Sequence, residues 1–136
     1  MLGLGDAGAH VATVCDASSP TSLVTHWARD RVRGGLLPLE FLVRRQTRDA
    51  ARAVGLLDRG VLAPGYNADI TLIDFATLTL ERPELVYDLP AGGKRLVQRA
   101  SGYRHTFLRG VEVARDDKPT GAFPGVVVRG SQPAPR

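Results

Sequence analysis

The sequence predicts a mixed α/β chain whose first half is helical and whose second half consists of short strands. Two observations support this prediction. Apolar residues recur at three- and four-residue spacings between residues 37 and 55, whereas after about residue 69 they alternate in short runs separated by glycine and proline. The length of 136 residues suits one ordinary domain, and 43% hydrophobic with 24% charged residues excludes a disordered chain.

Two helical regions are expected in the first half. The earlier one covers residues 22–31, and the later one covers residues 37–55. Pro38 suits the first turn of the later region, and Gly55 is placed to end it. Thr47 can also cap a second short helix, so this region is either one helix or two helices with a break.

The second half carries the β-rich segments. We expect strands over residues 70–75, 103–108, 111–114 and 126–129. Arg109 and Gly110 lie between two of these runs and predict a hairpin with a tight turn. Residues 82–102 contain two prolines and two adjacent glycines and predict a long irregular connection. The polar, proline-rich end predicts a disordered tail over residues 131–136.

The net charge of +4 and the pI near 9.8 raise the question of nucleic-acid binding. Sixteen of the 18 basic residues are arginine, and acidic residues are interleaved with them along the whole chain. A protein that binds phosphate backbones needs a basic stripe with aromatic residues between the charges, and the sequence has none. We therefore expect no nucleic-acid partner.

Membrane insertion and secretion are also disfavoured by the sequence. No run approaches eighteen consecutive apolar residues, and the first residues lack the basic and apolar regions of a secretory signal. The single cysteine, Cys15, cannot form an internal disulfide. We expect a cytoplasmic protein with no membrane partner.

The run Asp6-Ala-Gly-Ala-His10 is the strongest local constellation of chemically active groups. It follows a short β-like segment, residues 2–6, and its small residues let a carboxylate and an imidazole four apart point into an open site. The carboxylate can act as a metal ligand or general base, and the imidazole can bind substrate. Ordinary turn chemistry is the alternative interpretation.

Other reactive side chains predict structural roles. The residue types of a nucleophilic triad occur at Asp16, Ser18, Ser19 and His26. These four residues lie in one short stretch without a Gly-x-Ser-x-Gly elbow. The start of a helix is the better interpretation of the two serines. Cys15 has no basic neighbour to lower its pKa, so we expect an inert thiol.

Several short runs around the middle of the chain occur in a recognisable order. They are residues 47–56, the Asp58-Arg59-Gly60 turn, residues 62–65 and residues 68–74. Together they resemble the C-terminal signature of the amidohydrolase superfamily. That signature is a helix that ends in Gly-Leu, then an Asp-Arg-Gly turn, a Pro-Gly turn and an Ala-Asp strand that ends in Asp. Residues 88–93, 110–113 and 120–125 look like the end of N-acyl-D-amino-acid deacylases, or D-aminoacylases. The resemblance extends over about residues 3–130.

This resemblance implies an α/β fragment. Residues 1–58 would be the end of a TIM-like barrel, with its last strand and closing helices, and residues 59–130 part of a small β-sandwich. In that family the barrel holds one or two metal ions, usually zinc, and the last barrel strand ends in an aspartate that touches the metal and handles the proton of the attacking water. Asp6 matches this aspartate, so the resemblance implies that it is both metal ligand and catalytic base.

Two further residues are candidates for substrate binding. His10 would contact the substrate or the tetrahedral oxyanion. Arg29, on the first expected helix, would meet a substrate carboxylate as a bidentate fork, although a solvated helix arginine is the alternative.

The His-x-His motif and the later metal histidines of the family are absent from the sequence, and one or two ligands do not complete a zinc hydrolase site. We therefore expect the C-terminal portion of a zinc-dependent hydrolase that acts on non-peptide C–N bonds, with an N-acyl-D-amino acid as its small-molecule substrate. We expect this chain to be inactive alone and to need an N-terminal region or partner chain. The alternatives are a non-catalytic module that completes a partner chain and a fragment of a cyclic-amide hydrolase such as a dihydroorotase or hydantoinase.

Overall fold

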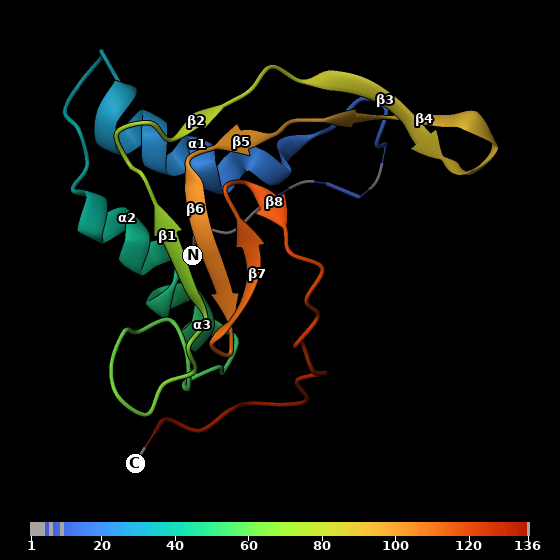
Figure 1. The fold of residues 1–136 in the computed structure, drawn as a ribbon. Coiled ribbons are helices and arrows are strands. Elements are labelled where there is room, and N and C mark those ends of the chain that lie inside the picture. Colours follow the sequence, from blue (N-terminus) through green and yellow to red (C-terminus); the bar gives the residue numbers. More distant parts are fainter. Residues whose placement is uncertain (1–4, 6, 9, 136) are drawn as a thin grey trace.

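The computed structural model describes residues 5, 7–8 and 10–135 (Figure 1). Its first helical segment begins with a 3-10 turn, Asp16–Ser18, continues as α1, Ser19–Thr25, and ends as a π-helical turn, His26–Asp30. Pro20 lies in the first turn of α1, where its missing N–H leaves no hydrogen bond unmade. The expected helix over residues 22–31 is therefore confirmed in outline, but it begins earlier.

The later helical region is divided at Thr47. Helix α2 spans Leu39–Gln46 and α3 spans Arg48–Ala53. The backbone of Thr47 leaves the helical conformation, and its hydroxyl donates to the Val43 carbonyl at 2.8 Å. Thr47 thus closes α2 and does not cap α3 with its side chain. None of the described helices combines the length and apolarity needed to span a membrane.

Within the described residues, four strands form an antiparallel sheet in the order β1-β6-β7-β8. Their bounds are Ile70–Ile73 for β1, Tyr103–Leu108 for β6, Val111–Arg115 for β7 and Lys118–Pro119 for β8. Arg109 and Gly110 join β6 to β7, and both have positive φ, 53° and 79°. A two-residue hairpin turn requires this backbone conformation, so the predicted hairpin is confirmed.

The prediction of an irregular connection over residues 82–102 is wrong. This region forms an antiparallel ribbon that projects from the rest of the chain (Figure 1). Its strands are β2, Thr79–Leu80, paired with β5, Ala100–Ser101, and β3, Glu84–Leu89, paired with β4, Gly93–Val97. The Pro90–Gly92 turn occupies the tip, and Arg95 donates two hydrogen bonds to the Asp88 carboxylate at 2.7 and 2.6 Å. Pro90 and Gly92 therefore mark a hairpin turn, not a coil.

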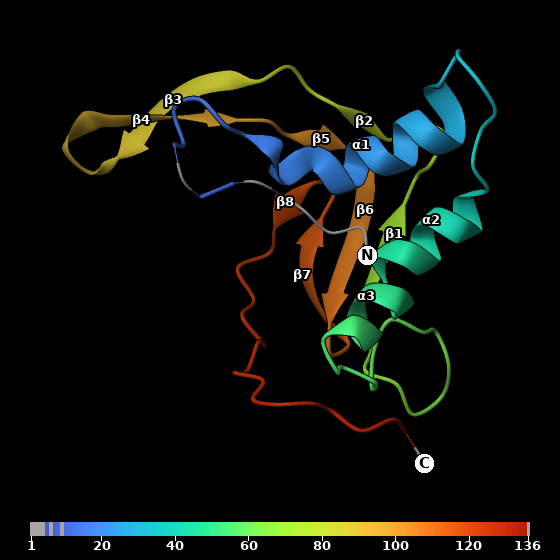
Figure 2. The ribbon, with the colours of Figure 1, turned by 180° about the vertical axis from the view of Figure 1, so that it is seen from behind.

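The helices cover one face of the four-stranded sheet. Figure 1 shows the sheet in front of the helices, and Figure 2, turned by 180°, shows the helices in front. Helix α1 contacts β2 and α2. At the contact between α1 and the sheet, the Thr21 hydroxyl lies 2.5 Å from the Tyr103 hydroxyl. Segments far apart in sequence thus meet where the helical half joins the strand half.

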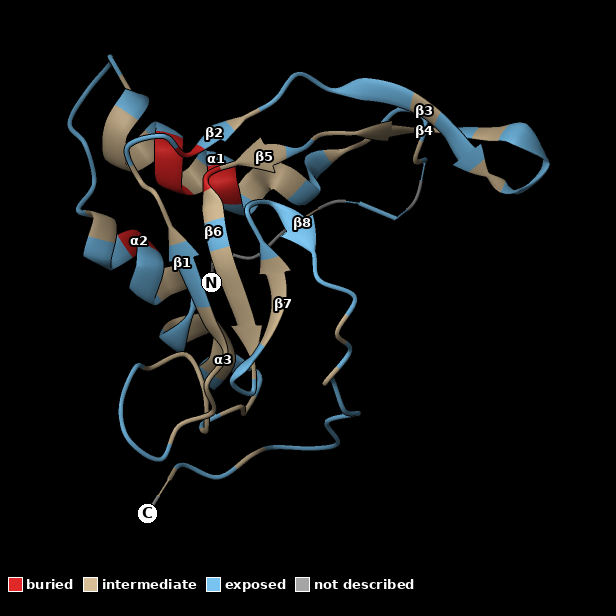
Figure 3. Cartoon of the chain, viewed as in Figure 1, coloured by how far each residue is buried: buried red, intermediate tan, exposed pale blue. Residues whose placement is uncertain are grey.

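The core is small. Its buried apolar side chains among the described residues are Val24 on α1, Leu42 on α2 and Leu78 just before β2. Figure 3 shows buried positions on α1 and α2. The accessible surface is 9556 Å², whereas a compact protein of this mass exposes about 6,900 Å². Large apolar side chains, such as Leu62 at 84% and Phe123 at 94% exposure, account for part of this surplus. The chain therefore carries apolar surface that its own fold does not cover.

The C-terminal segment differs from the sequence expectation at two places. The strand expected over residues 126–129 is absent, because none of the described segments pairs with it. The tail was expected to be disordered from residue 131, yet the backbone of Gln132 pairs with Gly55 and Leu57, its N–H donating to the Gly55 carbonyl at 2.8 Å. These hydrogen bonds make Gln132 and Leu56 partners in a parallel β-bridge.

The structure is a mixed α/β arrangement with antiparallel sheets, as expected for part of an amidohydrolase. The expected last barrel strand falls on residues 3–6, of which only Gly5 belongs to the described residues. The barrel end in residues 1–58 and the partial β-sandwich in residues 59–130 therefore stay predictions.

Replacing Leu78 by alanine tests the importance of this small core. Leu78 is 1% exposed, so its truncation leaves a cavity and should lower the free energy of unfolding by about 2–5 kcal/mol. Urea denaturation of the full chain measures the change. Leu62→Ala is the matched control, because this leucine is 84% exposed and its loss should cost less than about 0.5 kcal/mol. Equal effects of the two substitutions would show that Leu78 is not a core residue.

Candidate functional site

The loop that carries the predicted site leads into the first helical segment. Backbone hydrogen bonds to two successive carbonyls hold this loop. His10 has a left-handed backbone, with φ of 50°, and its carbonyl accepts hydrogen bonds from the N–H groups of Thr13 at 2.7 Å and Val14 at 3.0 Å. The next carbonyl, that of Val11, accepts from the Leu96 N–H of β4 at 2.7 Å. The loop is thus a tight turn held against the projecting ribbon, and the His10 residue is exposed on it.

Asp6 lies outside the described residues, so its predicted roles as metal ligand and catalytic base stay predictions. Its neighbour Gly5 is described. A Cβ placed on Gly5 would lie 3.8 Å from the Ala17 Cα, at the 3-10 turn that begins the first helical segment. Gly5 therefore lies beside the start of that segment.

Arg29 fastens its helix to the loop that follows β1. Its guanidinium donates hydrogen bonds to the backbone carbonyls of Phe75 at 2.5 Å, Ala76 at 3.3 Å and Leu78 at 2.7 Å. The same group forms an ion pair with Asp30, with 2.6 Å between Nε and Oδ1. The hydrogen bond within this pair raises the pKa of Arg29 and lowers the pKa of Asp30. Arg29 is neither a solvated arginine nor an open fork, because several of its donors are used inside the chain.

The structure does not bring the described candidates together. No hydrogen bond between His10 and Arg29 is found in the described part of the chain, and their local contacts are with different elements. His10 is placed by the turn beside β4, whereas Arg29 is held at the loop between β1 and β2. The predicted substrate contacts of both residues stay predictions.

The described residues do not fit a complete metal centre. Residues 5, 7–8 and 10–135 contain no cluster of three or more histidine, cysteine, aspartate or glutamate side chains able to hold a metal ion. A catalytic zinc ion needs about three protein ligands and an open position for water. The described residues alone therefore do not supply the ligands of a catalytic zinc ion.

His105, on β6, belongs to a charged cluster on the sheet. Its Nδ1 atom lies 2.6 Å from Glu112 Oε1 on β7, and Arg115 donates to the same carboxylate. Hydrogen bonds from Arg115 and His105 lower the pKa of Glu112 to about 2. The imidazole thus joins neighbouring strands, which is a structural role.

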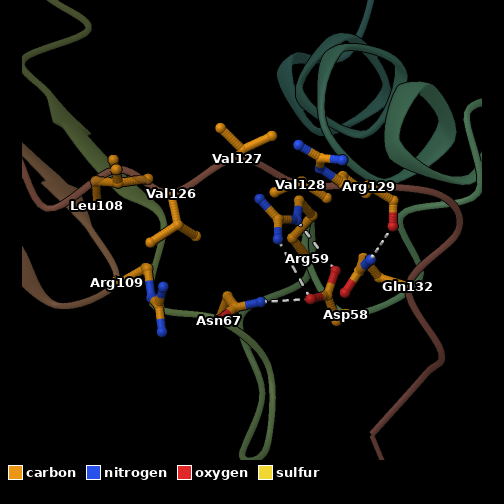
Figure 4. Close-up of a pocket in the computed structure, with 11 residues that line it drawn as sticks. Asp58, Arg59, Asn67, Leu108, Arg109, Val126, Val127, Val128, Arg129 and Gln132 are labelled. Carbon is orange, nitrogen blue, oxygen red and sulfur yellow. Dashed lines mark hydrogen bonds and ion pairs between the residues drawn. The ribbon is translucent and has the colours of Figure 1, made fainter.

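A hollow of about 280 Å³ lies between the β6–β7 turn, the loop after α3 and the C-terminal segment (Figure 4). Its walls combine arginines with valines, and Figure 4 shows dashed lines from the Asp58 carboxylate to both Arg59 and Asn67. Arg59 Nε lies 3.0 Å from Asp58 Oδ1, and Asn67 Nδ2 donates to the same carboxylate at 2.5 Å. The Arg59 hydrogen bond lowers the pKa of Asp58.

This hollow lacks the groups of a catalytic site. Its described lining contains no histidine, cysteine, serine, threonine or lysine, and its carboxylate is already bonded to Arg59 and Asn67. Arg59 also contacts Asp69 at 3.2 Å, and Asp69 accepts the backbone N–H of Arg109 at 2.9 Å. The arrangement is therefore a set of ion pairs and hydrogen bonds that holds the β6–β7 turn against the loop after α3.

The sequence predicts a turn at Asp58-Arg59-Gly60, and the structure adds the contacts that this turn makes. Gly60 has φ of 78°, and a Cβ on it would lie 2.9 Å from the backbone of Thr47 and Arg48. A side chain at this position would clash with the junction between α2 and α3. The glycine is thus required by close backbone approach. Asp58 and Arg59 form the ion pairs and hydrogen bonds that hold the β6–β7 turn.

A family profile described as "Amidohydrolase family" matches residues 1–114. The chain belongs to the amidohydrolase family. It is 34% identical over 107 residues, 76% of its length, to the D-aminoacylase of Alcaligenes xylosoxydans xylosoxydans. It is 34% identical over 92 residues, 64% of its length, to an adenine deaminase of Sinorhizobium fredii. An imidazolonepropionase of Paracoccus denitrificans is 41% identical over 78 residues, 54% of the chain.

These matches cover a small part of each relative. The aligned region is 19% of the D-aminoacylase, 15% of the adenine deaminase and 19% of the imidazolonepropionase. No solved structure gives a significant match to the chain. The comparisons support membership of the amidohydrolase family, without singling out the D-aminoacylases.

Replacing Arg29 by glutamine separates a structural role from a substrate role. Loss of its hydrogen bonds to backbone carbonyls should lower the free energy of unfolding by about 1–3 kcal/mol. Urea denaturation of the full chain measures this loss, with Arg33→Gln as a control of the same chemistry at an exposed position. Unchanged stability in Arg29→Gln would refute the fastening role.

Proposed function

We propose that this chain supplies the C-terminal part of a zinc-dependent amidohydrolase that cleaves the linear amide of N-acyl-D-amino acids. The alignment with the D-aminoacylase supports this proposal, because it extends over 76% of the chain, against 64% and 54% for the other two relatives described. Members of the amidohydrolase superfamily are generally metal-dependent. Zinc is the metal proposed here, with Asp6 among its ligands.

Asp6 acts in this proposal as the general base. Its carboxylate accepts a proton from the water molecule as the water oxygen bonds to the amide carbon. When the C–N bond breaks, Asp6 returns this proton to the leaving amine. The products are a carboxylic acid and an amino acid, and the base regains its starting state.

His10 is proposed to position the substrate. Its tight turn, anchored through Val11 to β4, holds an exposed imidazole four residues after Asp6. An imidazole N–H in this place donates a hydrogen bond to the substrate or to the tetrahedral oxyanion. Arg29 is a weaker candidate, because three backbone carbonyls and Asp30 already use its donors.

The proposed active form includes a barrel region that this chain joins, either in one polypeptide or as a partner chain. Two observations support this part of the proposal. The described residues do not form a complete metal centre, and the accessible surface of 9556 Å² exceeds that of a compact protein of equal mass. A purely structural module that completes a partner chain would show the same surface, but the assembled protein would lack hydrolase activity.

Deamination of adenine is the second candidate activity, favoured by the 34% identity to the adenine deaminase. The two candidates differ in their products. Hydrolysis of an N-acyl-D-amino acid releases a primary amine, whereas deamination releases ammonia. Parallel assays with N-acetyl-D-amino acids and with adenine distinguish them in one preparation of the assembled enzyme.

The purified chain alone should neither retain zinc stoichiometrically nor hydrolyse N-acetyl-D-amino acids. One carboxylate and one imidazole leave a zinc ion short of ligands. Metal analysis after gel filtration and a primary-amine assay measure the two properties. One zinc ion per chain together with turnover would show that the chain holds a complete ligand set.

The role of Asp6 is testable in a chimera. The whole chain replaces the part of the Alcaligenes D-aminoacylase with which it aligns, and activity towards N-acetyl-D-amino acids is measured. Asp6→Asn should lower kcat by about 10²–10⁴-fold, because the asparagine amide cannot accept the proton. His10→Ala should raise KM more than it lowers kcat.

Arg33→Gln serves as the exposed control in the chimera, and zinc content with circular dichroism verifies that each variant is folded and loaded. An Asp6→Asn chimera with a kcat within about threefold of its parent would remove the catalytic assignment. A folded, zinc-loaded parent chimera that acts on adenine and not on N-acyl-D-amino acids would favour the second candidate.

A further inference from the structure

The segment from Val11 to Ser18 joins the His10 turn to the first helix, and both of its ends are tied to the projecting ribbon. The Val11 carbonyl accepts the Leu96 N–H of β4 at 2.7 Å. The Ser18 hydroxyl donates to the Gln98 side-chain carbonyl at 2.5 Å. The two ribbon partners are nearly adjacent in the chain, so the segment is closed into a loop on a short stretch of the ribbon. Figure 2 shows the chain before α1 passing beside this ribbon.

Gln98 lies between β4 and β5, where the ribbon changes from one pair of strands to the other. Its side-chain amide nitrogen donates to the Glu81 carbonyl, across the ribbon, at 3.0 Å. The backbone adds a second crossing here, because the Glu81 N–H donates to the Arg99 carbonyl at 2.9 Å. The nitrogen of the Gln98 amide therefore holds the ribbon, and its oxygen holds Ser18.

The Ser18 end of the segment is firm, because the helix beyond it is attached to the sheet. The Thr21 hydroxyl of α1 lies 2.5 Å from the Tyr103 hydroxyl of β6, and Thr21 is buried. Residues that support a functional side chain are themselves fixed by hydrogen bonds to rigid elements. Gln98 has this arrangement, since it is half-buried and connects a strand pair to an anchored helix.

The geometry of the His10 turn depends on this closure. The His10 carbonyl accepts the N–H groups of Thr13 and Val14, which both lie inside the closed segment. His10 itself has φ of 50°, a backbone conformation that non-glycine residues rarely adopt. A segment with free ends has more conformations to occupy than one whose ends are tied. Loss of the Ser18 contact would therefore loosen the turn and let the imidazole move.

We propose that Gln98 is a positioning residue for the His10 turn and acts through Ser18. This inference rests on the proposed function, in which His10 binds the substrate, and it adds a supporting residue 80 positions beyond Ser18. When only a fraction of the molecules holds a binding group in its productive position, the apparent affinity falls by that fraction. Gln98 thus acts on substrate binding, whereas proton transfer stays with Asp6.

Kinetics of the D-aminoacylase chimera test this role. Gln98→Met keeps the approximate size of the side chain and removes the groups that bond Ser18 and Glu81. It should raise KM about 2- to 10-fold, the worth of a hydrogen bond, and leave kcat within about twofold. Gln46→Met is the matched control, because Gln46 donates to the Pro20 carbonyl at 2.9 Å and so ties α1 to α2 instead of to the ribbon. It should leave KM unchanged.

A double-mutant cycle separates positioning from general stability. In a His10→Ala background, Gln98→Met should change KM by less than about twofold, because no imidazole is left to position. Ser18→Ala should reproduce the KM of Gln98→Met, and the two together should do no more than either alone. A lower kcat with unchanged KM, an equal effect of Gln46→Met, or full additivity with His10→Ala would overturn the proposal.

Hydrogen exchange in the full chain tests the contact without metal or substrate. The Val14 and Leu96 amides, followed by NMR, should exchange faster in Gln98→Met than in the parent, and at the parent rate in Gln46→Met. Equal rates in Gln98→Met and the parent would overturn the inference. An inactive parent chimera would count against the proposed function alone, and the exchange rates then decide whether Gln98 holds the turn.

Discussion

The attachment of the first helical segment, residues 16–30, to the loop between β1 and β2 is the contact on which the rest of the structure depends. Leu78, in that loop, is 1% exposed, and Arg29 donates to its carbonyl at 2.7 Å. A Cβ on Gly102 would lie 2.8 Å from the Leu78 Cα, so the chain just before β6 passes directly against the same residue. One buried leucine thus organises a helix, a loop and the entry to the central strand.

A core of this size explains the exposed apolar surface. The helices cover one face of the sheet, while the C-terminal segment, with Val127 at 80% exposure, lies outside the packed region (Figures 1 and 2). The aligned region represents 15–19% of the three relatives described, so in those proteins many more residues are available to cover corresponding surfaces. Surface left uncovered by one chain is the physical basis for the proposed association with a barrel region.

Local sequence signals predicted the elements that local interactions determine. The hairpin around Arg109 and Gly110 follows from backbone preference at a tight turn, and the break at Thr47 was one of two alternatives. The ribbon from β2 to β5 was missed because Pro83, just before β3, and the proline and glycines near the tip were together interpreted as a coil. The strand at residues 126–129 was overpredicted for the opposite reason: its propensity is high, but strand formation needs a partner that local sequence does not reveal.

The candidate site shows the same division between local and long-range information. The spacing of Asp6 and His10 was visible in the sequence, whereas the use of Arg29 donors by Phe75 and Leu78 depends on residues nearly fifty positions away. The Asp-Arg-Gly turn is explained by backbone approach at Gly60 and not by chemistry. A signature that serves the scaffold can be shared by enzymes with different names, as the matches to a D-aminoacylase, an adenine deaminase and an imidazolonepropionase illustrate. The reaction proposed for this chain therefore depends on the loop of Asp6 and His10, while Asp58, Arg59 and Gly60 serve the packing around the β6–β7 turn and the α2–α3 junction.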